Sequence, residues 1–212
     1  MTTGRKLPRS FYLHDDVVEL ARALLGKVLV TELEGKRTAG IITETEAYAG
    51  INDSASHAYQ GRRTARNEVM YAIGGTAYVY INYGLHHLFN VVTNREEIPH
   101  AILIRSIEPL EGLDVMLERR GKQTLSYTLT TGPGSAARAL GITKELNGAD
   151  LLGHLIWIED RGISFSTRQI ATSPRIGIDS CGKDRLKPYR FLVKDSPWVS
   201  RSPQKLGQKM RL

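Results

Sequence analysis

The chain has 212 residues, of which 41% are hydrophobic and 24% are charged, proportions typical of a soluble globular protein. These values exclude a wholly disordered chain, a fibrous repeat and a bundle of membrane helices. The 29 basic residues outnumber the 22 acidic ones and give a formal net charge of +7, which suits a polyanionic partner without identifying it. The one cysteine, Cys181, excludes an intramolecular disulfide and a cysteine-based zinc site, so we expect a reducing compartment.

The organisation of the chain favours one domain over residues 1–212, because we find no internal repeat and no low-complexity linker. No stretch approaches the roughly 20 apolar residues that a membrane span needs. The N-terminal region lacks the apolar core of a signal peptide, since acids follow directly after Phe11–Leu13. We therefore expect a soluble, cytoplasmic protein whose termini (1–10 and 201–212) can fray, the second of them as a basic tail.

A helix is predicted over about Asp15–Leu25, because apolar residues recur there at i, i+3, i+4 and i+7. Asp15 or Asp16 can cap the start of this helix, and Gly26 can end it. Two strands joined by a short turn follow as a hairpin: Lys27–Leu33 and Arg37–Ala47.

The middle of the chain begins with a polar, irregular stretch over Gly50–Asn67, typical of a long ordered loop of the kind that is often functional. A second hairpin is predicted with Tyr83-Gly84 near its tip: Thr76–Tyr83 and Leu85–Thr93. The remaining predicted elements are a strand, two helices and two late strands: Ala101–Ile107, Pro109–Arg120, Pro133–Leu140, Leu155–Glu159 and Tyr189–Val193. The first of these helices is predicted because Leu110, Leu113 and Leu117 would share one side of it. Because strands and helices do not alternate as βαβ units, we expect an α+β fold with a mostly antiparallel sheet.

Candidate catalytic groups gather in the run TETEAYAGINDSASHAYQG. Glu44 and Glu46 are two residues apart and share one face of a strand, which Tyr48 continues, and His57 follows in the loop. A carboxylate, a tyrosine and a histidine at a strand end are suited to hydrolysis, with the carboxylate drawing a proton from water. The alternative is a solvated strand face with an edge tyrosine.

A second group of interest is the aromatic hairpin AYVYINYGLHHLFNVV. Tyr78 and Tyr80 share a strand face, and an aromatic Tyr83 on a protruding tip is suited to wedging between stacked bases. The alternative is three tyrosines that pack a sheet, where tyrosine is favoured. His86 and His87 are adjacent and point to opposite faces, so we expect no zinc site and no metal.

Arg105 is the only charge in the apolar run AILIRSI, so it needs an acid or a phosphate as its partner. A structural ion pair with a buried glutamate, including Glu46 itself, is compatible with a catalytic role. Gly132–Ser135 opens a helix whose N–H groups could bind phosphate, although an ordinary helix start explains it as well. The absence of P-loop and dinucleotide-binding glycine patterns disfavours nucleotide hydrolysis and hydride transfer.

A series of runs resembles the alkyladenine DNA glycosylase family, also called the 3-methyladenine or methylpurine DNA glycosylases, from about Leu13 to Ser200. The runs, in chain order, are ETEAY, DSASHA, RRTARN, GTAYVYINYG, HHLFNVV, LIRSIEPLEG, TGPG, RIGI and FLVKDSPWVS. The resemblance implies a monofunctional base-excision enzyme that removes alkylated purines and, in some members, hypoxanthine and ethenoadenine. It also implies that no metal or cofactor is needed. The implied fold is one domain with a curved antiparallel sheet, surrounding helices and a protruding hairpin.

The resemblance also implies a role for individual residues. Glu46 matches the general base that activates water. Arg105 matches an arginine near that water and the sugar phosphate of the target, and the backbone of Ile176 matches a group that helps to hold the water. The residues that match the enclosure of the flipped base are Tyr48, His57 and Tyr80. Tyr83 matches the wedge that fills the vacated duplex, and Asn90 matches a pocket residue that clashes with the exocyclic amine of guanine.

The expected partner is double-stranded DNA with damaged purines, bound by a monomer that does not associate with membranes. Some of the surplus basic residues would then contact DNA phosphates, and the candidates are Arg62, Arg63 and Arg66. The alternative is that these three arginines are solvated loop charges. One competing hypothesis is a non-catalytic nucleic-acid-binding module on a related scaffold. Another is a glycosylase with lyase activity, which requires an amine nucleophile, although no lysine lies in the matching motifs.

Overall fold

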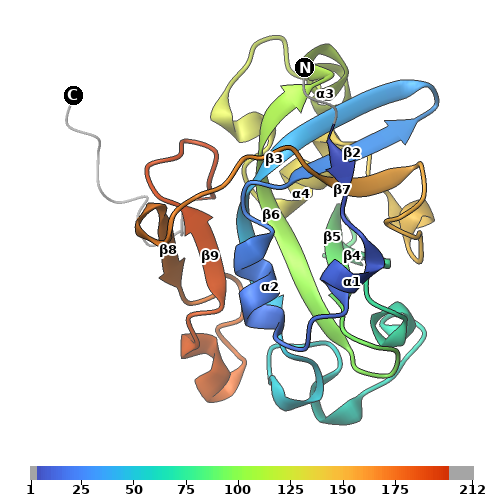
Figure 1. Ribbon diagram of the computed structural model, residues 1–212, viewed down its shortest axis with the longest axis vertical. Coiled ribbons are helices and arrows are strands. Elements are labelled where there is room, and N and C mark those ends of the chain that lie inside the picture. Colours follow the sequence, from blue (N-terminus) through green and yellow to red (C-terminus); the bar gives the residue numbers. More distant parts are fainter. Residues whose placement is uncertain (1–3, 201–212) are drawn as a thin grey trace.

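The computed structural model describes residues 4–200, and a curved antiparallel sheet forms its centre (Figure 1). The main path of the sheet runs, in spatial order, through β1 (Arg5–Lys6), β7 (Ile156–Asp160), β2 (Val28–Leu33), β3 (Lys36–Tyr48), β6 (His100–Glu111), β5 (His86–Thr93) and β4 (Ala77–Asn82). A side branch consists of β8 (Ile170–Ser173) and β9 (Arg190–Val193), and β9 pairs with β3. The prediction of an α+β fold with a mostly antiparallel sheet is confirmed.

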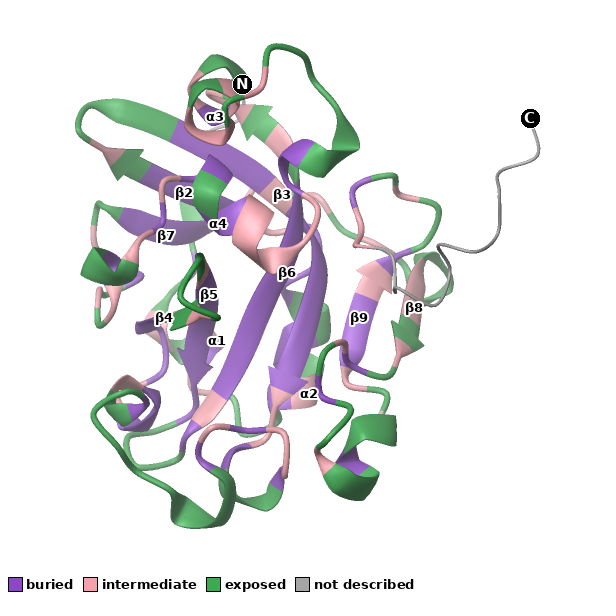
Figure 2. Ribbon diagram, turned by 180° about the vertical axis from the view of Figure 1, so that it is seen from behind, coloured by how far each residue is buried: buried purple, intermediate pink, exposed green. Residues whose placement is uncertain are grey.

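Short helices and turns surround the sheet. The α-helices are α1 (Arg9–Tyr12), α2 (Val17–Ala23), α3 (Leu113–Arg120) and α4 (Pro133–Ala139). The 3-10 turns are η1 (Gly50–Asn52), η2 (Tyr59–Gly61), η3 (Glu68–Tyr71), η4 (Tyr127–Leu129), η5 (Lys144–Leu146), η6 (Thr167–Gln169) and η7 (Gly182–Leu186). The main hydrophobic core joins Leu20 of α2 and Ala136 of α4 to sheet residues such as Ile104. Figure 2 shows the buried residues following β3 and β6, whereas the tip of the β4–β5 hairpin is exposed. No helix among residues 4–200 is long and apolar enough to cross a membrane.

The sheet divides along β3. The first half of β3 pairs with β2, from Lys36 to Ile41, and a later stretch pairs with β9, from Glu44 to Glu46. β6 pairs along the opposite edge, and its register shifts on either side of Glu44. Such irregularities bend a strand and re-aim its side chains. Glu44 and Glu46 therefore lie between β6 and β9, at the point where β3 has changed partners.

The predicted first helix is present as α2, with narrower bounds. The side chain of Asp16 accepts hydrogen bonds from the backbone N–H groups of Val18 (2.7 Å) and Glu19 (3.1 Å), which satisfies two donors that a helix start leaves open. Gly26 has φ +86°, a left-handed conformation that favours glycine. The cap and the stop signal seen in the sequence are both used.

The predicted helix over Pro109–Arg120 was wrong in its first turn. Pro109 and Glu111 continue β6 and pair with Gly40 and Ala39 of β3, and the helix begins only after Gly112, which has φ +70°. Leu110, placed by its spacing on the apolar face of the helix, is 43% exposed. Pairing with the long strand β3 outweighs a helical spacing of three leucines.

The N-terminal residues also differ from the expectation that residues 1–10 can fray. Arg5 and Lys6 pair with β7, Leu7 is buried, and α1 begins at Arg9. Strand pairing and burial of an apolar side chain both hold a terminus in place. The basic tail, residues 201–212, lies outside the described residues.

Candidate active site

A cavity of about 700 Å³ opens between the 54–62 loop, the β4–β5 hairpin and the segment around Ile176. Every residue that the resemblance assigned to a site lines this cavity except Glu46, and these residues are Tyr48, His57, Tyr80, Tyr83, Asn90, Arg105 and Ile176. Segments far apart in the sequence therefore meet at one concave surface, the usual form of a small-molecule or base pocket.

The Glu46 carboxylate lies directly behind the cavity wall and is fully buried. Its Oε1 accepts a hydrogen bond from the backbone N–H of Ile176 at 2.8 Å, and its Oε2 accepts one from the hydroxyl of Tyr48 at 2.9 Å. Nη1 of Arg105 forms an ion pair with Oε2 at 3.2 Å. Since all three partners also line the cavity, one layer of side chains and backbone separates Glu46 from the open space.

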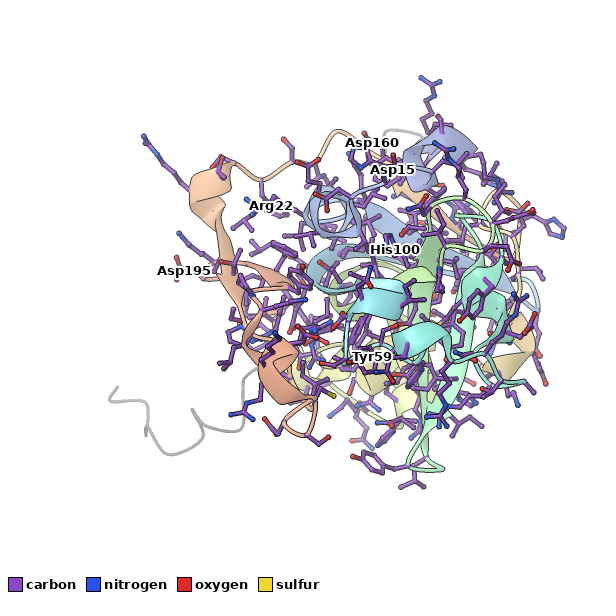
Figure 3. All side chains as sticks on the ribbon, turned by 90° about the horizontal axis from the view of Figure 1, so that it is seen from below. Asp15, Arg22, Tyr59, His100, Asp160 and Asp195 are labelled. Carbon is purple, nitrogen blue, oxygen red and sulfur yellow. The ribbon has the colours of Figure 1, made fainter. Side chains whose placement is uncertain are left out.

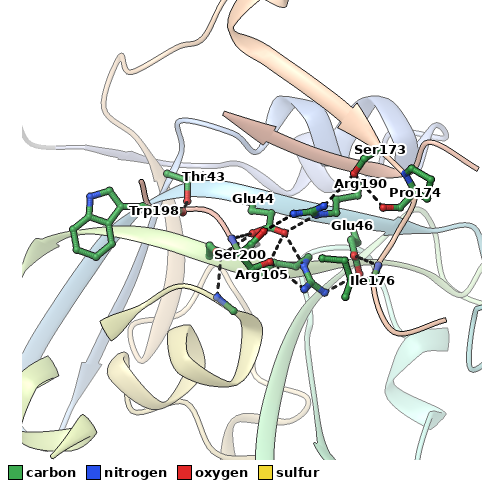
Figure 4. A network of polar contacts seen from close by, with 12 residues as sticks. Thr43, Glu44, Glu46, Arg105, Ser173, Pro174, Ile176, Arg190, Trp198 and Ser200 are labelled. Carbon is green, nitrogen blue, oxygen red and sulfur yellow. Dashed lines mark hydrogen bonds and ion pairs between the residues drawn. The ribbon is translucent and has the colours of Figure 1, made fainter. Parts of the chain in front are cut away.

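Arg105 joins Glu46 to the second carboxylate of β3 (Figure 4). Its Nε donates a hydrogen bond to Oε1 of Glu44 at 2.9 Å, and Arg190 of β9 donates from its own Nε to the same oxygen at 2.7 Å. Both glutamates are fully buried. The expected ion pair between Arg105 and a buried glutamate is confirmed, and it includes both acids.

Two tyrosines and a histidine form an aromatic wall of the cavity. The ring of His57 lies 4.7 Å from the ring of Tyr80 between centroids, and Tyr80 lies 5.3 Å from Tyr78. Nδ1 of His57 is 2.8 Å from the hydroxyl of Tyr78. Burial, together with nearby Arg66 and Arg62, lowers the pKa of His57 to about 4, so the imidazole is neutral at neutral pH.

The opposite part of the lining is held by Tyr48 and a buried charge pair that the sequence reasoning missed. Burial raises the pKa of the Tyr48 hydroxyl well above its usual value, so the hydroxyl stays protonated and remains a donor to Glu46. Behind the ring, the guanidinium carbon of Arg175 lies 4.7 Å from the ring centroid. Arg175 binds both oxygens of Asp53, at 2.5 and 2.8 Å. Asp53 and Arg175 are the first residues of the runs DSASHA and RIGI, and that position was the available signal.

Asn90 lies on β5 directly opposite Tyr78 of β4. Its Nδ2 donates a hydrogen bond to the backbone carbonyl of Tyr78 at 3.2 Å, and the residue is buried to 97%. The amide is therefore fixed in the cavity lining by the backbone of the neighbouring strand, and it cannot turn away from the cavity without losing this bond.

Tyr83 stands at the tip of the β4–β5 hairpin, as predicted, and is 89% exposed. The loop of residues 83–85 joins the paired residues Asn82 and His86, and Tyr83 and Gly84 in it both have positive φ, +48° and +71°. Leu85 N–H donates to the carbonyl of Asn82 at 3.1 Å and closes the turn. A left-handed conformation is costly for a non-glycine residue. Tyr83 therefore occupies the tip in a backbone conformation that is unfavourable for tyrosine.

The loop over residues 50–67 is ordered by its own hydrogen bonds, as its sequence indicated. Nδ2 of Asn67 donates to the carbonyls of His57 (3.0 Å) and Arg62 (2.8 Å). Figure 3 views the molecule from below and labels Tyr59 on this segment, well apart from Asp195, which follows β9. Tyr59 is 39% exposed and lines the cavity, so the loop adds a further aromatic group that the sequence analysis did not single out.

The three arginines proposed for phosphate contacts differ in their surroundings. Arg63 forms ion pairs with Glu68 at 2.7 Å and Glu97 at 2.6 Å, and its charge is already matched within the protein. Arg62 and Arg66 have no ion-pair partner among residues 4–200. Arg62 lines the cavity, and the guanidinium of Arg66 lies 5.2 Å from the ring centroid of Tyr80. Arg62 at the cavity and Arg66 against a cavity residue are therefore the two exposed arginines of the three whose charges are not matched by an ion pair among the described residues.

The described part of the chain holds no cluster of three histidine, cysteine or acidic side chains that could bind a metal ion. Its chemistry-bearing groups at the cavity are carboxylates, arginines, aromatic rings and amides. This set is suited to enclosing a flat, electron-poor group and to drawing a proton from water.

Residues 10–197 match the family model of the methylpurine-DNA glycosylases. The chain belongs to this family. A protein of Chlamydia abortus is 52% identical over 188 residues, which cover 88% of this chain and 97% of the relative. A protein of Desulfitobacterium hafniense is 45% identical over 203 residues (92% and 98%), and one of Methanocella arvoryzae is 45% identical over 196 residues (92% and 96%). Each relative carries the name "Putative 3-methyladenine DNA glycosylase". The resemblance drawn from the motifs is confirmed: the chain is a DNA glycosylase, and DNA is its substrate.

Proposed function

We propose that this DNA glycosylase removes alkylated purines from double-stranded DNA and leaves an abasic site. In this proposal the damaged nucleotide swings out of the helix, and a water activated by Glu46 hydrolyses its N-glycosidic bond. The observation that carries the proposal is that three residues lining the aromatic cavity also contact the buried Glu46 carboxylate. A base in the cavity would then bring its sugar close to the carboxylate.

Extrusion of the nucleotide is needed because the N-glycosidic bond cannot be reached inside a stacked duplex, and it costs a few kcal/mol. The side chain of Tyr83, 89% exposed at the hairpin tip, can stack in the vacated space. Base–aromatic stacking contributes about 1–3 kcal/mol, enough to offset much of the unstacking. Arg62 and Arg66 at the cavity mouth would bind the flanking phosphates.

Recognition in the cavity follows from charge. A purine alkylated at a ring nitrogen is cationic, and the faces of aromatic rings attract cations. Tyr48, Tyr80 and a neutral His57 supply such faces without a repelling charge. Asn90, fixed in the lining by its hydrogen bond to β4, would clash with the exocyclic amine of guanine and disfavour that base.

The chemical step has a simple balance. The water oxygen bonds to the anomeric carbon C1′, the bond from C1′ to the purine nitrogen breaks, and its electron pair neutralises the cationic base. Glu46 accepts the proton of the water, and its negative charge stabilises the oxocarbenium-like sugar in the transition state. Because the base is already a good leaving group, the reaction requires no metal or cofactor.

Access of water to Glu46 requires a small rearrangement. Among residues 4–200, Oε1 accepts one hydrogen bond, from Ile176, while each carboxylate oxygen offers about two acceptor sites. The free acceptor site would take the water once the entering sugar displaces the thin layer in front of it. We therefore expect Glu46 to become accessible in the DNA complex.

The residues that line the cavity favour simple hydrolysis by a monofunctional enzyme over lyase chemistry. A Schiff base needs an amine nucleophile, and the cavity residues of the described chain include no lysine. Incubation with borohydride and a lesion duplex should therefore trap no covalent complex. Nothing in the proposed reaction requires a second copy of the chain, so we propose that it acts as a monomer.

The decisive experiment is the Glu46→Gln variant in single-turnover excision of 7-methylguanine from duplex DNA, followed by alkaline cleavage of abasic sites. We expect retained binding and a loss of about 10²- to 10⁴-fold in rate, the range of general-base catalysis. Glu108→Gln, on the exposed surface of β6, is the matched control and should excise normally. Near-normal excision by Glu46→Gln would refute the assignment.

A further inference from the structure

The second buried carboxylate of β3 has no part in the reaction described so far, yet it is the more heavily bonded of the two. Glu44 receives hydrogen bonds from the side chains of Arg105 (2.9 Å), Arg190 (2.7 Å) and Ser106 (2.8 Å). It also receives bonds from the hydroxyl (2.7 Å) and the backbone N–H (2.6 Å) of Ser200. A carboxylate has about four lone-pair sites, so Glu44 is saturated and cannot bind water.

The charge state of Glu44 is fixed by the same contacts. Burial by itself would raise its pKa, but Arg105, Arg190 and Ser200 together lower the pKa of Glu44 below its ordinary value. Glu44 is therefore a permanent anion at neutral pH and is not a proton acceptor. Its function has to lie in what it does to its partners.

Arg105 is the partner that Glu44 shares with Glu46 (Figure 4). Its Nε donates to Glu44, its Nη2 donates to the hydroxyl of Ser200 at 3.2 Å, and its Nη1 faces Glu46 at 3.2 Å. The guanidinium is planar and rigid, so the hydrogen bonds of Nε and Nη2 fix the position of Nη1. Glu44 and Ser200 thus decide how closely Arg105 approaches Glu46.

The distances show that Arg105 is bound more tightly to Glu44 than to Glu46. The contact to Glu44 is a hydrogen bond at 2.9 Å, whereas the contact to Glu46 is a longer ion pair at 3.2 Å. An arginine that is hydrogen-bonded to a carboxylate stabilises the ionised form and makes that carboxylate a weaker base. A general base needs the opposite, an ionised form that still accepts a proton readily.

We propose that Glu44 is a positioning residue for base excision: it holds Arg105 by its Nε and shares its charge, so that Glu46 retains an acceptor site for water. This inference rests on the proposed role of Glu46 as the general base. The two carboxylates of β3 then have separate tasks, because one orients the arginine and the other activates the water.

Three other titratable groups also face Glu46. Tyr48 on β3, Tyr80 on β4 and Arg175 before Ile176 each interact with the charge of Glu46. None of these three contacts Glu44. Arg190 donates to Glu44, to Ser173 and to the Ser200 carbonyl, so its donors are directed away from Glu46. Arg105 is the side chain that contacts both Glu44 and Glu46.

The test is the pH profile of single-turnover 7-methylguanine excision in Glu44→Gln and Glu44→Asp, below neutral pH, where the methylated base stays cationic. In Glu44→Gln the charge of Arg105 acts on Glu46 alone. We expect the plateau rate to fall about tenfold and the midpoint of the acid limb to move down by roughly half a pH unit or more. Glu44→Asp keeps the charge, and its midpoint should stay near that of the unchanged protein.

A purely structural role for Glu44 predicts a different result, in which less folded protein lowers the rate equally at every pH and leaves the midpoint unchanged. That outcome would overturn the inference. If Glu44→Gln does not fold, Arg190→Gln is measured instead, and its midpoint should move up, because Glu44 then draws Arg105 away from Glu46. An unchanged or lowered midpoint in Arg190→Gln would also overturn it.

Glu46→Gln, measured in the same series, separates this inference from the proposed function. Normal excision by Glu46→Gln means that Glu46 is not the base, and both proposals fail. Loss of excision in Glu46→Gln together with an unshifted profile in Glu44→Gln contradicts the positioning role alone.

Discussion

Arg175 stacks its guanidinium against the ring of Tyr48, with its central carbon 4.7 Å from the ring centroid. The side chains of Arg175 and of its carboxylate partner Asp53 are both 0% exposed. Arg175 also donates to the carbonyl of Ala47 at 2.8 Å, and Ile176, the next residue, donates to Glu46. One buried cation therefore supports both Tyr48 and the Ile176 N–H that holds the candidate base.

The first prediction concerns the stability of this buried pair. Asp53→Asn removes the negative charge and leaves Arg175 buried without compensation, which costs about 3–5 kcal/mol in comparable pairs. We expect the free energy of unfolding, measured by urea denaturation, to fall by about that amount. Glu118→Gln is the control, because the Lys36–Glu118 pair is 48% and 69% exposed and should contribute less than about 1 kcal/mol. Equal losses in the two variants would contradict the prediction.

The same pair shows where prediction from sequence reached its limit. Local signals predicted a cap of α2 at Asp15 or Asp16 and the tip of the β4–β5 hairpin, because capping and turn chemistry act over a few residues. Asp53 and Arg175, by contrast, are 122 residues apart, and no spacing rule connects them. The local pattern left the partner of Arg105 open, and only the fold adds Glu44 to Glu46.

The division of β3 could not be predicted either. The strand predicted over Arg37–Ala47 is present as β3, but the sequence did not indicate that its partner changes from β2 to β9 around Glu44, with shifts in register. Those shifts depend on β9, which follows β3 by more than a hundred residues. The helix expected from Pro109 failed for a related reason, because pairing with β3 extends β6 to Glu111.

A second prediction concerns the strained hairpin tip. Tyr83 has φ +48° and is 89% exposed, so its side chain adds little packing while its backbone costs about 1–2 kcal/mol. Asparagine tolerates this conformation. We expect Tyr83→Asn to raise the free energy of unfolding by roughly 1 kcal/mol and to weaken binding to lesion duplex about tenfold through lost stacking.

Tyr83→Phe is the matched control, since it keeps both the ring and the backbone conformation. Its stability and its lesion affinity should remain close to those of the unchanged protein. Binding to undamaged duplex should change little in either variant, because phosphate contacts dominate it. If Tyr83→Asn lost affinity equally for damaged and undamaged duplex, Tyr83 would not be a wedge.

A third prediction follows from the neutral histidine in the cavity. Burial and the neighbouring arginines lower the pKa of His57 from 6.5 to about 4, so in this range the unfolded chain binds a proton that the folded protein does not. His57 therefore does not reduce the free energy of unfolding above about pH 6.5. As the pH falls from 6.5 toward 4, the free energy of unfolding decreases, because the unfolded chain binds the proton more readily than the folded protein does. His57→Gln should flatten this part of the stability curve, measured by thermal or urea unfolding across the range.

His154→Gln, at an exposed position, is the control and should leave the curve unchanged. A curve for His57→Gln that superimposes on the original would contradict the assignment.

The last prediction tests the proposal that Asn90 distinguishes between purines in the cavity. The Asn90 amide is fixed by its hydrogen bond to the Tyr78 carbonyl, so it presents a rigid obstacle to a group at the purine C2 position. Guanine bases carry an amine there and adenine bases do not. Asn90→Ala should therefore raise the release of 7-methylguanine relative to 3-methyladenine by about tenfold, since one small group in a pocket is worth about 1–3 kcal/mol. Both bases are released from the same methylated duplex and quantified in one chromatogram, so the adenine product serves as the internal control for folding and turnover. A parallel change in both products would mean that the variant loosens the cavity in general, and Asn90 would then have no role in selecting the base.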